Sequence, residues 1–338
     1  MDPNDLLEAS QSAQSVWPII QTVIQTVVPS SIYLKLAGLS LRKKPSEWEK
    51  IRDEEMGKIA KDMLDAGELS PMEFFGLKNM AAIAEKADII WAERQQNEKG
   101  QDSTPLEEID IDWFVRYYED ASKVSNEKMQ KIWAGILAGE VVQPGSFSKR
   151  TLDVVRNMSA SDAVCFEEIS QYVVSSSYQA FIYSNNSIHK QHGISFAQLM
   201  QLQECGLIHA DSTLERQGTV DPSSPALVFR EDDLVCTVST TGKDVYTYGF
   251  PIYSLTSAGI ELLSVARTGV NRQFVANAVR ALSSEAHARS ELGNFSKIAA
   301  HPEIKFTLHR FISSTGQNVQ YDLAPLNLES AEFQPLQK

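Results

Sequence analysis

The sequence predicts a protein that is mainly α with a smaller α+β part: an N-terminal helical hairpin or bundle followed by a winged-helix-like domain. Three observations predict this fold. Residues 46–98 carry helix-start signals and apolar residues at rough helical spacing. A second periodic segment begins at Ser125, with apolar side chains at i, i+3, i+4, i+7 and i+8. After about Ser175, helical segments alternate with short runs typical of strands.

Residues 46–98 are expected to form a long helical hairpin. Ser46 and Ser70 are favourable N-cap residues. Pro71 suits the first helical position, because its missing N–H would have no partner there. Gly67 is a suitable end for the first of the two helices.

Changes in composition divide the chain further. The polar run QQNEKGQDST at 95–104 contains a glycine and is the best linker candidate before residue 150. The sequence predicts an N-terminal helical region (1–100) with an apolar segment at 16–41, a central helical domain (105–175), a winged-helix-like domain (176–268), a C-terminal helix with strands (269–326) and a disordered tail (327–338).

The winged-helix prediction depends on the order of elements between residues 160 and 266. This stretch reads as helix, strand, helix, β-hairpin and helix. A helix is predicted over 194–207, and strand-like runs at 226–230 and 234–240 would form the hairpin. Several all-helical or α+β folds share this order, so they stay open as alternatives.

The apolar segment 16–41 is long enough to cross a bilayer, but Pro29 and several polar residues interrupt it. Two short amphipathic helices fit it better, and their apolar face would pack inside the protein or against a second copy. A membrane-surface anchor formed by 16–44 is the alternative, since Trp17, Tyr33 and the basic residues 42–44 suit an interface. We expect a homo-oligomer, with the candidate self-association residues Trp17, Ile20, Ile24 and Val27.

Charge argues against tight binding to nucleic acid. The chain has 31 basic and 44 acidic residues, a formal net charge of −13. The expected recognition helix, 194–206, contains no lysine or arginine to contact phosphates. Residues 267–310 are the exception, with seven basic side chains against three acidic ones. Nucleic acid is therefore a weak alternative partner, with the candidate contacts Arg272, Arg280, Arg289 and Lys297.

The sequence carries no recognisable catalytic, metal-binding or cofactor-binding motif, so we predict no catalytic residue, metal or cofactor. His189 and His192 stand in a polar run and are expected in a solvated loop. Glu303 and Lys305 match the end of a nuclease signature, but the upstream stretch lacks the aspartate that would complete a magnesium site. The three cysteines form no CxxC pair, which indicates reduced thiols and a cytoplasmic protein.

A family resemblance lies in residues 112–166, DWFVRYYEDASKVSNEKMQKIWAGILAGEVVQPGSFSKRTLDVVRNMSASDAVCF. This run, with ERQQN at 93–97, resembles a bacterial family known only as a domain of unknown function. A looser resemblance is to the abortive-infection alpha proteins of phage defence, on the Trp-containing helix and the helix start at 158–163. That resemblance implies a setting in antiviral defence and no chemistry. From the residues alone, the motif is expected to form packing contacts between helices. Glu140 is an exception, and it is expected to hydrogen-bond the backbone of the following turn or to bind a partner.

These observations together predict a non-enzymatic interaction protein, a sensor or adaptor in antiphage or mobile-element defence, with a protein partner. Two alternatives stay open: a winged-helix protein that binds nucleic acid through residues 267–310, and a membrane-associated abortive-infection effector. The expected location is the cytoplasm, or the periphery of the inner membrane if residues 16–44 bind lipid.

Overall fold

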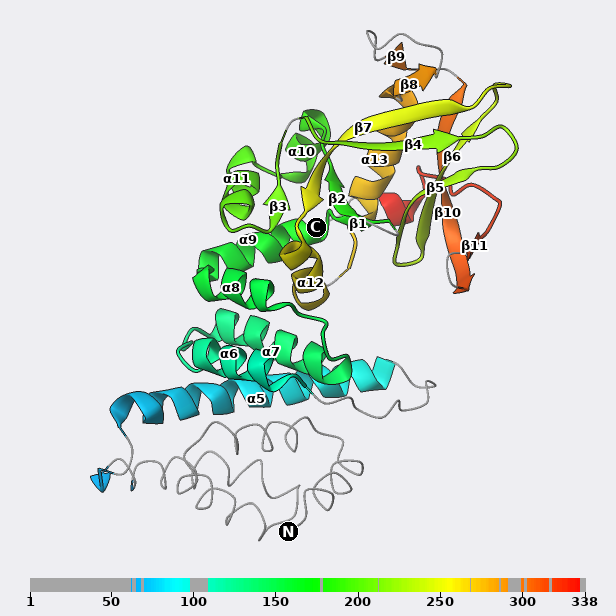
Figure 1. The fold of residues 1–338 in the computed structure, drawn as a ribbon. Helices are drawn as coiled ribbons and strands as arrows, with labels where there is room; N and C mark the ends of the chain where they lie inside the picture. The colour runs from blue at the N-terminus through cyan, green and yellow to red at the C-terminus, as the bar shows by residue number, and fades with distance from the viewer. Residues whose placement is uncertain are drawn as a thin grey trace. The chain divides into compact units, whose positions relative to one another are not determined.

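The computed structural model divides the chain into two compact units, Met1–Ala163 and Val164–Lys338, which are described separately (Figure 1). The division falls inside one helix, between the boundaries predicted at residues 105 and 176. The structure describes residues 62, 65–67, 70–97, 109–176, 179–211, 213–267, 269–285, 287–290, 299–300, 303–315 and 318–334.

The described part of unit 1 is helical, and polar side chains begin its helices as the sequence predicts. Ser70 forms a reciprocal cap with Glu73: its backbone N–H donates to the carboxylate (2.8 Å), and its hydroxyl accepts from the Glu73 N–H (3.2 Å). Asn126 and Ser148 cap the next periodic segments through their side chains. The helices are α5 (Pro71–Asn97), α6 (Ile111–Ala121), α7 (Glu127–Val142), α8 (Lys149–Asn157) and α9 (Ala160–Ser170), which continues into unit 2.

An aromatic cluster between α6 and α7 forms the core of unit 1. The ring of Trp113 stacks on Tyr117 at 5.3 Å between centroids, and Tyr117 meets Trp133 edge-on at the same distance. The Tyr117 hydroxyl donates to the Trp133 carbonyl (2.8 Å), and Trp113 Nε1 donates to the Phe147 carbonyl (2.6 Å). The aromatic residues of the family motif therefore pack and hydrogen-bond with one another.

Glu140 is a buried carboxylate, only 1% exposed, at the end of α7. Its two oxygens accept hydrogen bonds from the backbone N–H groups of Gly145 (2.7 Å) and Phe147 (3.0 Å). Gly145 has a φ of +84°, a conformation that glycine adopts without a steric penalty. Of the two roles expected for Glu140, bonding the following turn is confirmed.

Unit 2 is built around a large antiparallel sheet (Figure 1). Its strand order is β11-β10-β6-β5-β1-β2-β7-β8-β9, and β3 and β4 also pair with β7. The strands are β1 (Val174–Ser175), β2 (Ala180–Tyr183), β3 (Ile208–His209), β4 (Glu215–Val220), β5 (Ala226–Glu231), β6 (Leu234–Thr240), β7 (Tyr246–Leu255), β8 (His287–Ser290), β9 (Ala299–Ala300), β10 (Ile304–Thr315) and β11 (Asn318–Tyr321).

Unit 2 also contains helices, and one of them, α13, packs against β10 of the sheet. The ring of Phe250 on β7 lies 6.0 Å from both Phe181 on β2 and Phe306 on β10, so one aromatic core joins strands from distant parts of the chain. The helical elements are α10 (Asn186–His192), α11 (Phe196–Glu204), α12 (Ser257–Ala266), α13 (Arg272–Glu285) and the short 3₁₀ helix η1 (Ala331–Phe333).

The predicted fold class, mainly α with a winged-helix-like domain, is wrong. Strands at 226–231 and 234–240 exist as expected, but they do not form an isolated β-hairpin, as the wing of a winged-helix domain would. They pair outward with β1 and β10 and so belong to a much larger sheet. β10 pairs with β6 over seven residues, although the sequence had placed residues 304–312 in a separate C-terminal region. Pairing between such distant strands leaves no local pattern in the sequence.

The tail predicted to be disordered from residue 327 is ordered through residue 334. Phe333 of η1 is 1% exposed, so it is part of the core. Glu329 forms an ion pair with Arg280 (3.0 Å), and Glu332 forms one with Arg310 (2.8 Å). Residues 335–338 lie outside the described residues.

The segment 16–41 also lies outside the described residues, so its role in self-association or membrane binding stays a prediction. This holds for Trp17, Ile20, Ile24 and Val27 alike. Among the helices in the described part of the chain, none has both the length and the apolar character that a membrane span requires.

We predict that Gly259→Ala destabilises unit 2. Gly259 lies in the first turn of α12, and a Cβ added there would overlap the carbonyl oxygen of Leu207, a backbone atom that cannot rotate away. The expected loss is about 1–3 kcal/mol of unfolding free energy, measured by urea denaturation. Gly76→Ala in α5 is the control, because its Cβ would sit 3.4 Å from Ser122 Cβ, an ordinary contact. Equal stability of the two variants would contradict the packing described.

We predict that Glu140→Ala destabilises unit 1, because it leaves the N–H groups of Gly145 and Phe147 without their acceptor. The Phe147 N–H is buried, and a buried, unpaired group costs about 1–3 kcal/mol, whereas Gly145 is exposed and its N–H can bind water instead. Glu119→Ala removes an exposed carboxylate from α6 and should stay within about 0.5 kcal/mol of the native chain. Chemical denaturation followed by tryptophan fluorescence measures both. A Glu140→Ala chain as stable as Glu119→Ala would refute the role assigned to this carboxylate.

Candidate binding cleft

The two-residue turn Asp232–Asp233 joins β5 to β6 and holds several other segments of unit 2. Asp232 has a φ of +50°, a conformation that aspartate tolerates better than most residues. One of its carboxylate oxygens accepts a hydrogen bond from the Val270 N–H (3.1 Å), which positions the loop between α12 and α13. The carbonyl of Asp233 accepts from the Phe311 N–H on β10 (2.8 Å).

The Asp233 carboxylate binds two guanidinium groups, Arg272 at the start of α13 and Arg310 on β10. Partial burial alone would raise the pKa of Asp233, but hydrogen bonds and charge from Arg310 and Arg272 outweigh it and lower that pKa. Arg310 also binds Glu332 in η1, and the carboxylates of Glu332 and Asp233 raise the pKa of Arg310. One turn therefore joins β6, β10, α13 and the C-terminal segment.

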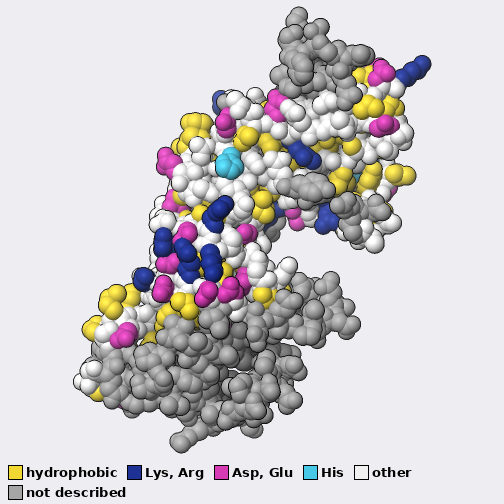
Figure 2. Space-filling view, viewed as in Figure 1, with side chains coloured by type: hydrophobic (Ala, Val, Ile, Leu, Met, Phe, Trp, Pro, Cys, Tyr) yellow, Lys and Arg dark blue, Asp and Glu magenta, His cyan; other side chains and the backbone are white. Residues whose placement is uncertain are grey.

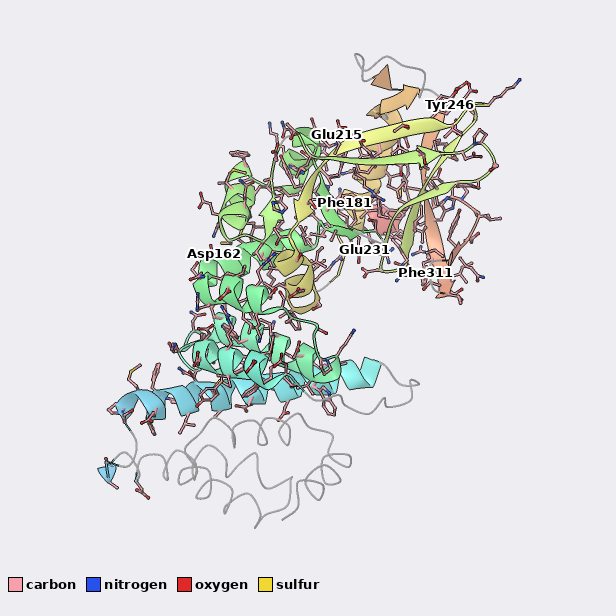
Figure 3. All side chains as sticks on the ribbon, viewed as in Figure 1. Asp162, Phe181, Glu215, Glu231, Tyr246 and Phe311 are labelled. Atoms are coloured by element: carbon pink, nitrogen blue, oxygen red, sulfur yellow. The ribbon has the colours of Figure 1, made fainter. Side chains whose placement is uncertain are left out.

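A second ion pair lies directly beside this turn. Arg267, the C-cap of α12, places Nη1 2.6 Å from Oε1 of Glu231 at the end of β5. Both side chains are largely buried, with exposed fractions of 11% and 13%. Nη2 of Arg267 donates to the Val173 carbonyl (2.8 Å), and Nε approaches the Gly269 carbonyl (3.5 Å). The pair joins the end of α12 to β1 and β5; Figure 3 labels Glu231 at this position.

The other carboxylate oxygen of Glu231, Oε2, is buried and has no hydrogen-bond partner among the described residues. A buried acceptor without a donor costs about 1–3 kcal/mol. Glu231 lines an open cleft, so a small movement of its carboxylate would bring Oε2 to a donor on a bound molecule, and the new hydrogen bond would recover this free energy.

The cleft has a volume of about 510 Å³, within the roughly 300–1,000 Å³ typical of ligand sites. One wall is apolar and comes from α12, where Ile260 is 43% exposed and Leu263 is buried beside it. The facing side is polar and contains the Glu231–Arg267 pair. The residues lining the cleft are Ser175, Glu231, Asp232, Ile260, Leu263, Ser264, Arg267 and Gly269.

The two predicted nucleic-acid contacts whose side chains the structure describes, Arg272 and Arg280, pair with groups of unit 2. Arg272 binds Asp233, and Arg280 binds Glu329 and the Leu328 carbonyl. Arg289 lies in β8, whose side chains are not described, and Lys297 lies outside the described residues. Arg272 and Arg280 hold the C-terminal segment and the 232–233 turn in place.

Basic side chains are also visible over the helices of unit 1, where they lie among acidic ones (Figure 2). Arg116 and Arg156 bind Asp153, and Lys149 lies 4.0 Å from Asp110. These interleaved charges neutralise one another and do not form a basic surface for phosphates.

The residues of the nuclease-like tripeptide have structural roles. Glu303 accepts a hydrogen bond from the hydroxyl of Tyr246, and this bond raises the pKa of Tyr246 to about 12. Ile304 and Lys305 pair with Thr240 and Ser239 of β6 in the sheet. Within the residues that the structure describes, no three histidine, cysteine or acidic side chains lie close enough together to hold a metal ion.

His189 and His192 were expected in a solvated loop, and this expectation is wrong. Both lie on α10, and His189 is buried with Nε2 2.8 Å from the Tyr183 carbonyl. Burial lowers the pKa of His189, partly offset by its bond to Tyr183. Burial and the nearby His189 also lower the pKa of His192, whose Nε2 lies 3.1 Å from Asn277 Nδ2. A short amphipathic helix had been mistaken for a polar loop.

The residues that line the cleft were missed in the sequence. Of these residues, only Arg267 lies in a predicted candidate surface, the basic stretch 267–310, while Glu231 and Ile260 lie in none. The available signal was the acidic run Glu231–Asp233 between two strands, opposite an arginine at a helix end. That signal does not specify which acidic side chain forms an ion pair with which arginine.

We predict that acidification destabilises unit 2. The folded-state pKa values of His189 and His192 lie below the ordinary value of 6.5, so the unfolded chain binds more protons below that pH. Their contribution to stability is therefore complete above about pH 6.5 and is lost as the pH falls toward the folded-state values. Thermal midpoints measured between pH 7.5 and 5 should fall, and His189→Gln should weaken this dependence. His209→Gln, at an exposed position of β3, is the control; an unchanged slope in His189→Gln would contradict the assignment.

Comparison with known proteins places these features in one family. A family model described as "Protein of unknown function (DUF2806)" matches residues 87–279, more than half of the chain. No curated protein and no solved structure gives a significant match. The matched range contains the aromatic cluster, Glu140 and every residue that lines the cleft. The expected resemblance to a family of unknown function is confirmed at that level, while the resemblance to abortive-infection proteins stays a prediction. The chain belongs to the DUF2806 family.

Proposed function

We propose that this protein is a non-enzymatic interaction protein, a sensor or adaptor, that binds a protein partner in the cleft of unit 2. The observation that carries the proposal is Oε2 of Glu231, a buried acceptor without a donor among the described residues, beside the exposed apolar side chain of Ile260. A partner can cover the apolar surface and supply the missing hydrogen-bond donor at the same time.

The shape of the cleft favours a protein segment as the occupant. Ile260 and Ser264 are four residues apart on α12, so they lie on the same face of the helix, and both are exposed. An extended segment laid along this face would contact the apolar wall and the polar pair together. Its side chains supply both the apolar contact and the missing donor.

A sensor role is supported by the position of Glu231 in the chain. The next two residues, Asp232 and Asp233, hold the loop before α13, the strand β10 and the C-terminal segment. A partner that moves Glu231 would act on a turn that joins these elements. Binding in the cleft would then change how firmly the C-terminal segment is held.

Nucleic acid is the weaker candidate partner, because the described arginines of residues 267–310 already bind carboxylates. Arg272 and Arg310 share Asp233, and Arg280 binds Glu329. Breaking these pairs to reach phosphates would leave carboxylates beside the nucleic acid. The antiphage setting and the cytoplasmic location stay predictions, the first from the resemblance of residues 112–166 and the second from cysteine usage.

Site-specific photo-crosslinking in cells that carry the gene tests the proposal. A benzophenone amino acid at position 260 should give a discrete adduct with one protein, which mass spectrometry identifies. The same amino acid at position 204, exposed on α11 and outside the lining of the cleft, is the control and should give no such adduct. The proposal fails if position 260 gives no adduct, or gives the same adducts as position 204.

A further inference from the structure

We infer that the partner inserts a lysine side chain into the cleft, with its ammonium group on Glu231 and its aliphatic stem against Ile260 and Leu263. The inference rests on the proposed function, since it names the chemistry that the same cleft recognises. It follows from which hydrogen-bonding groups of the cleft already have partners within unit 2, and from the net charge of the residues that line the cleft.

Two donors of the cleft, the Arg267 guanidinium and the Ser264 hydroxyl, are engaged within unit 2. Each of the three guanidinium nitrogens of Arg267 has a partner: Nη1 binds Glu231, Nη2 donates to the Val173 carbonyl, and Nε approaches the Gly269 carbonyl. Ser264 donates its hydroxyl to the Glu261 carbonyl (2.8 Å). A carboxylate or phosphate ligand would therefore find the cation of this cleft already neutralised by Glu231.

The acceptors of the cleft are in excess. Oε2 of Glu231 has no donor within the described residues, and Asp232 adds a second, exposed carboxylate that receives the Val270 N–H on Oδ2. Two carboxylates against one guanidinium leave the lining with a net negative charge. A ligand that complements it must carry a positive charge and donate hydrogen bonds.

Lysine fits this arrangement better than arginine. Arginine recognises a carboxylate best as a planar fork that uses both oxygens, but Oε1 of Glu231 is already taken by Arg267. A single remaining oxygen suits the compact ammonium of lysine, which donates from one nitrogen. The four-carbon stem of lysine would lie on the apolar wall formed by Ile260 and Leu263, as such stems do on apolar surfaces.

Selection from a phage-displayed library of random heptapeptides, with the full chain as bait, tests the inference without assuming a flanking sequence. We expect enrichment of peptides with one lysine beside aliphatic residues. In a synthetic enriched peptide, norleucine in place of that lysine should weaken binding about tenfold or more, since it keeps the stem and removes the charge. Enrichment of arginine or of acidic residues instead, or of no residue type, would overturn the inference.

Variants of the chain locate the binding at the cleft. Glu231→Gln should weaken the peptide about tenfold, whereas Glu204→Gln makes the same chemical change at an exposed position of α11 and should leave binding unchanged. Because Glu231→Gln disturbs a buried pair, Ile260→Lys is the second variant. It keeps that pair and places a competing ammonium on the wall, so it should also weaken binding. Tight binding to both variants would overturn the inference.

Two further outcomes separate this inference from the proposed function. If 1,5-diaminopentane alone binds and no lysine peptide does, the occupant is a small amine, and the lysine partner is wrong. If position 260 forms its protein adduct while lysine is not enriched, the proposed function stands and the inference falls. If lysine peptides bind at Glu231 while position 260 forms no adduct in cells, the cleft recognises lysine as inferred, and the protein partner of the proposed function is wrong.

Discussion

The architecture of unit 2 depends on one carboxylate held between two guanidinium groups. Asp233 binds Arg272 from α13 and Arg310 from β10, and Arg310 forms a second ion pair with Glu332 in η1. The three segments are far apart in sequence, and the tight turn 232–233 brings them to one point. Removing Asp233 would leave both guanidinium groups without this shared partner, so the turn contributes, together with the buried Phe333, to the position of the C-terminal segment.

Unit 1 uses a carboxylate for a related purpose. Glu140 is buried and binds two backbone N–H groups of the turn that follows α7, while Trp113 binds the Phe147 carbonyl of the same turn. The residues that carry the family resemblance are therefore the ones that build the core of this unit. Their physical role is to fill the core and to position the backbone of the turn.

This use of charge also shapes what the protein can bind. The arginines of the basic stretch that were candidates for phosphate contacts, where described, neutralise carboxylates of the same unit. Glu231 is different, because its partner Arg267 satisfies only one of its oxygens and the other is buried at an open cleft. A surface whose unpaired groups are hydrogen-bond acceptors selects a cationic donor, whereas a surface with unpaired guanidinium groups would select an anion.

The sequence by itself determined several of the local elements. Ser70 and Pro71 marked the start of α5, the apolar stripe marked α7, and the strands β5 and β6 were found almost to the residue, because caps and periodicity depend on neighbouring residues. Only the tertiary structure decided that β10 joins β6, that Arg272 faces Asp233, and that Glu231 meets Arg267 beside Ile260. Each of these contacts joins residues more than 25 positions apart, and such partners are chosen by the register of the sheet and the packing of the whole unit rather than by any local pattern.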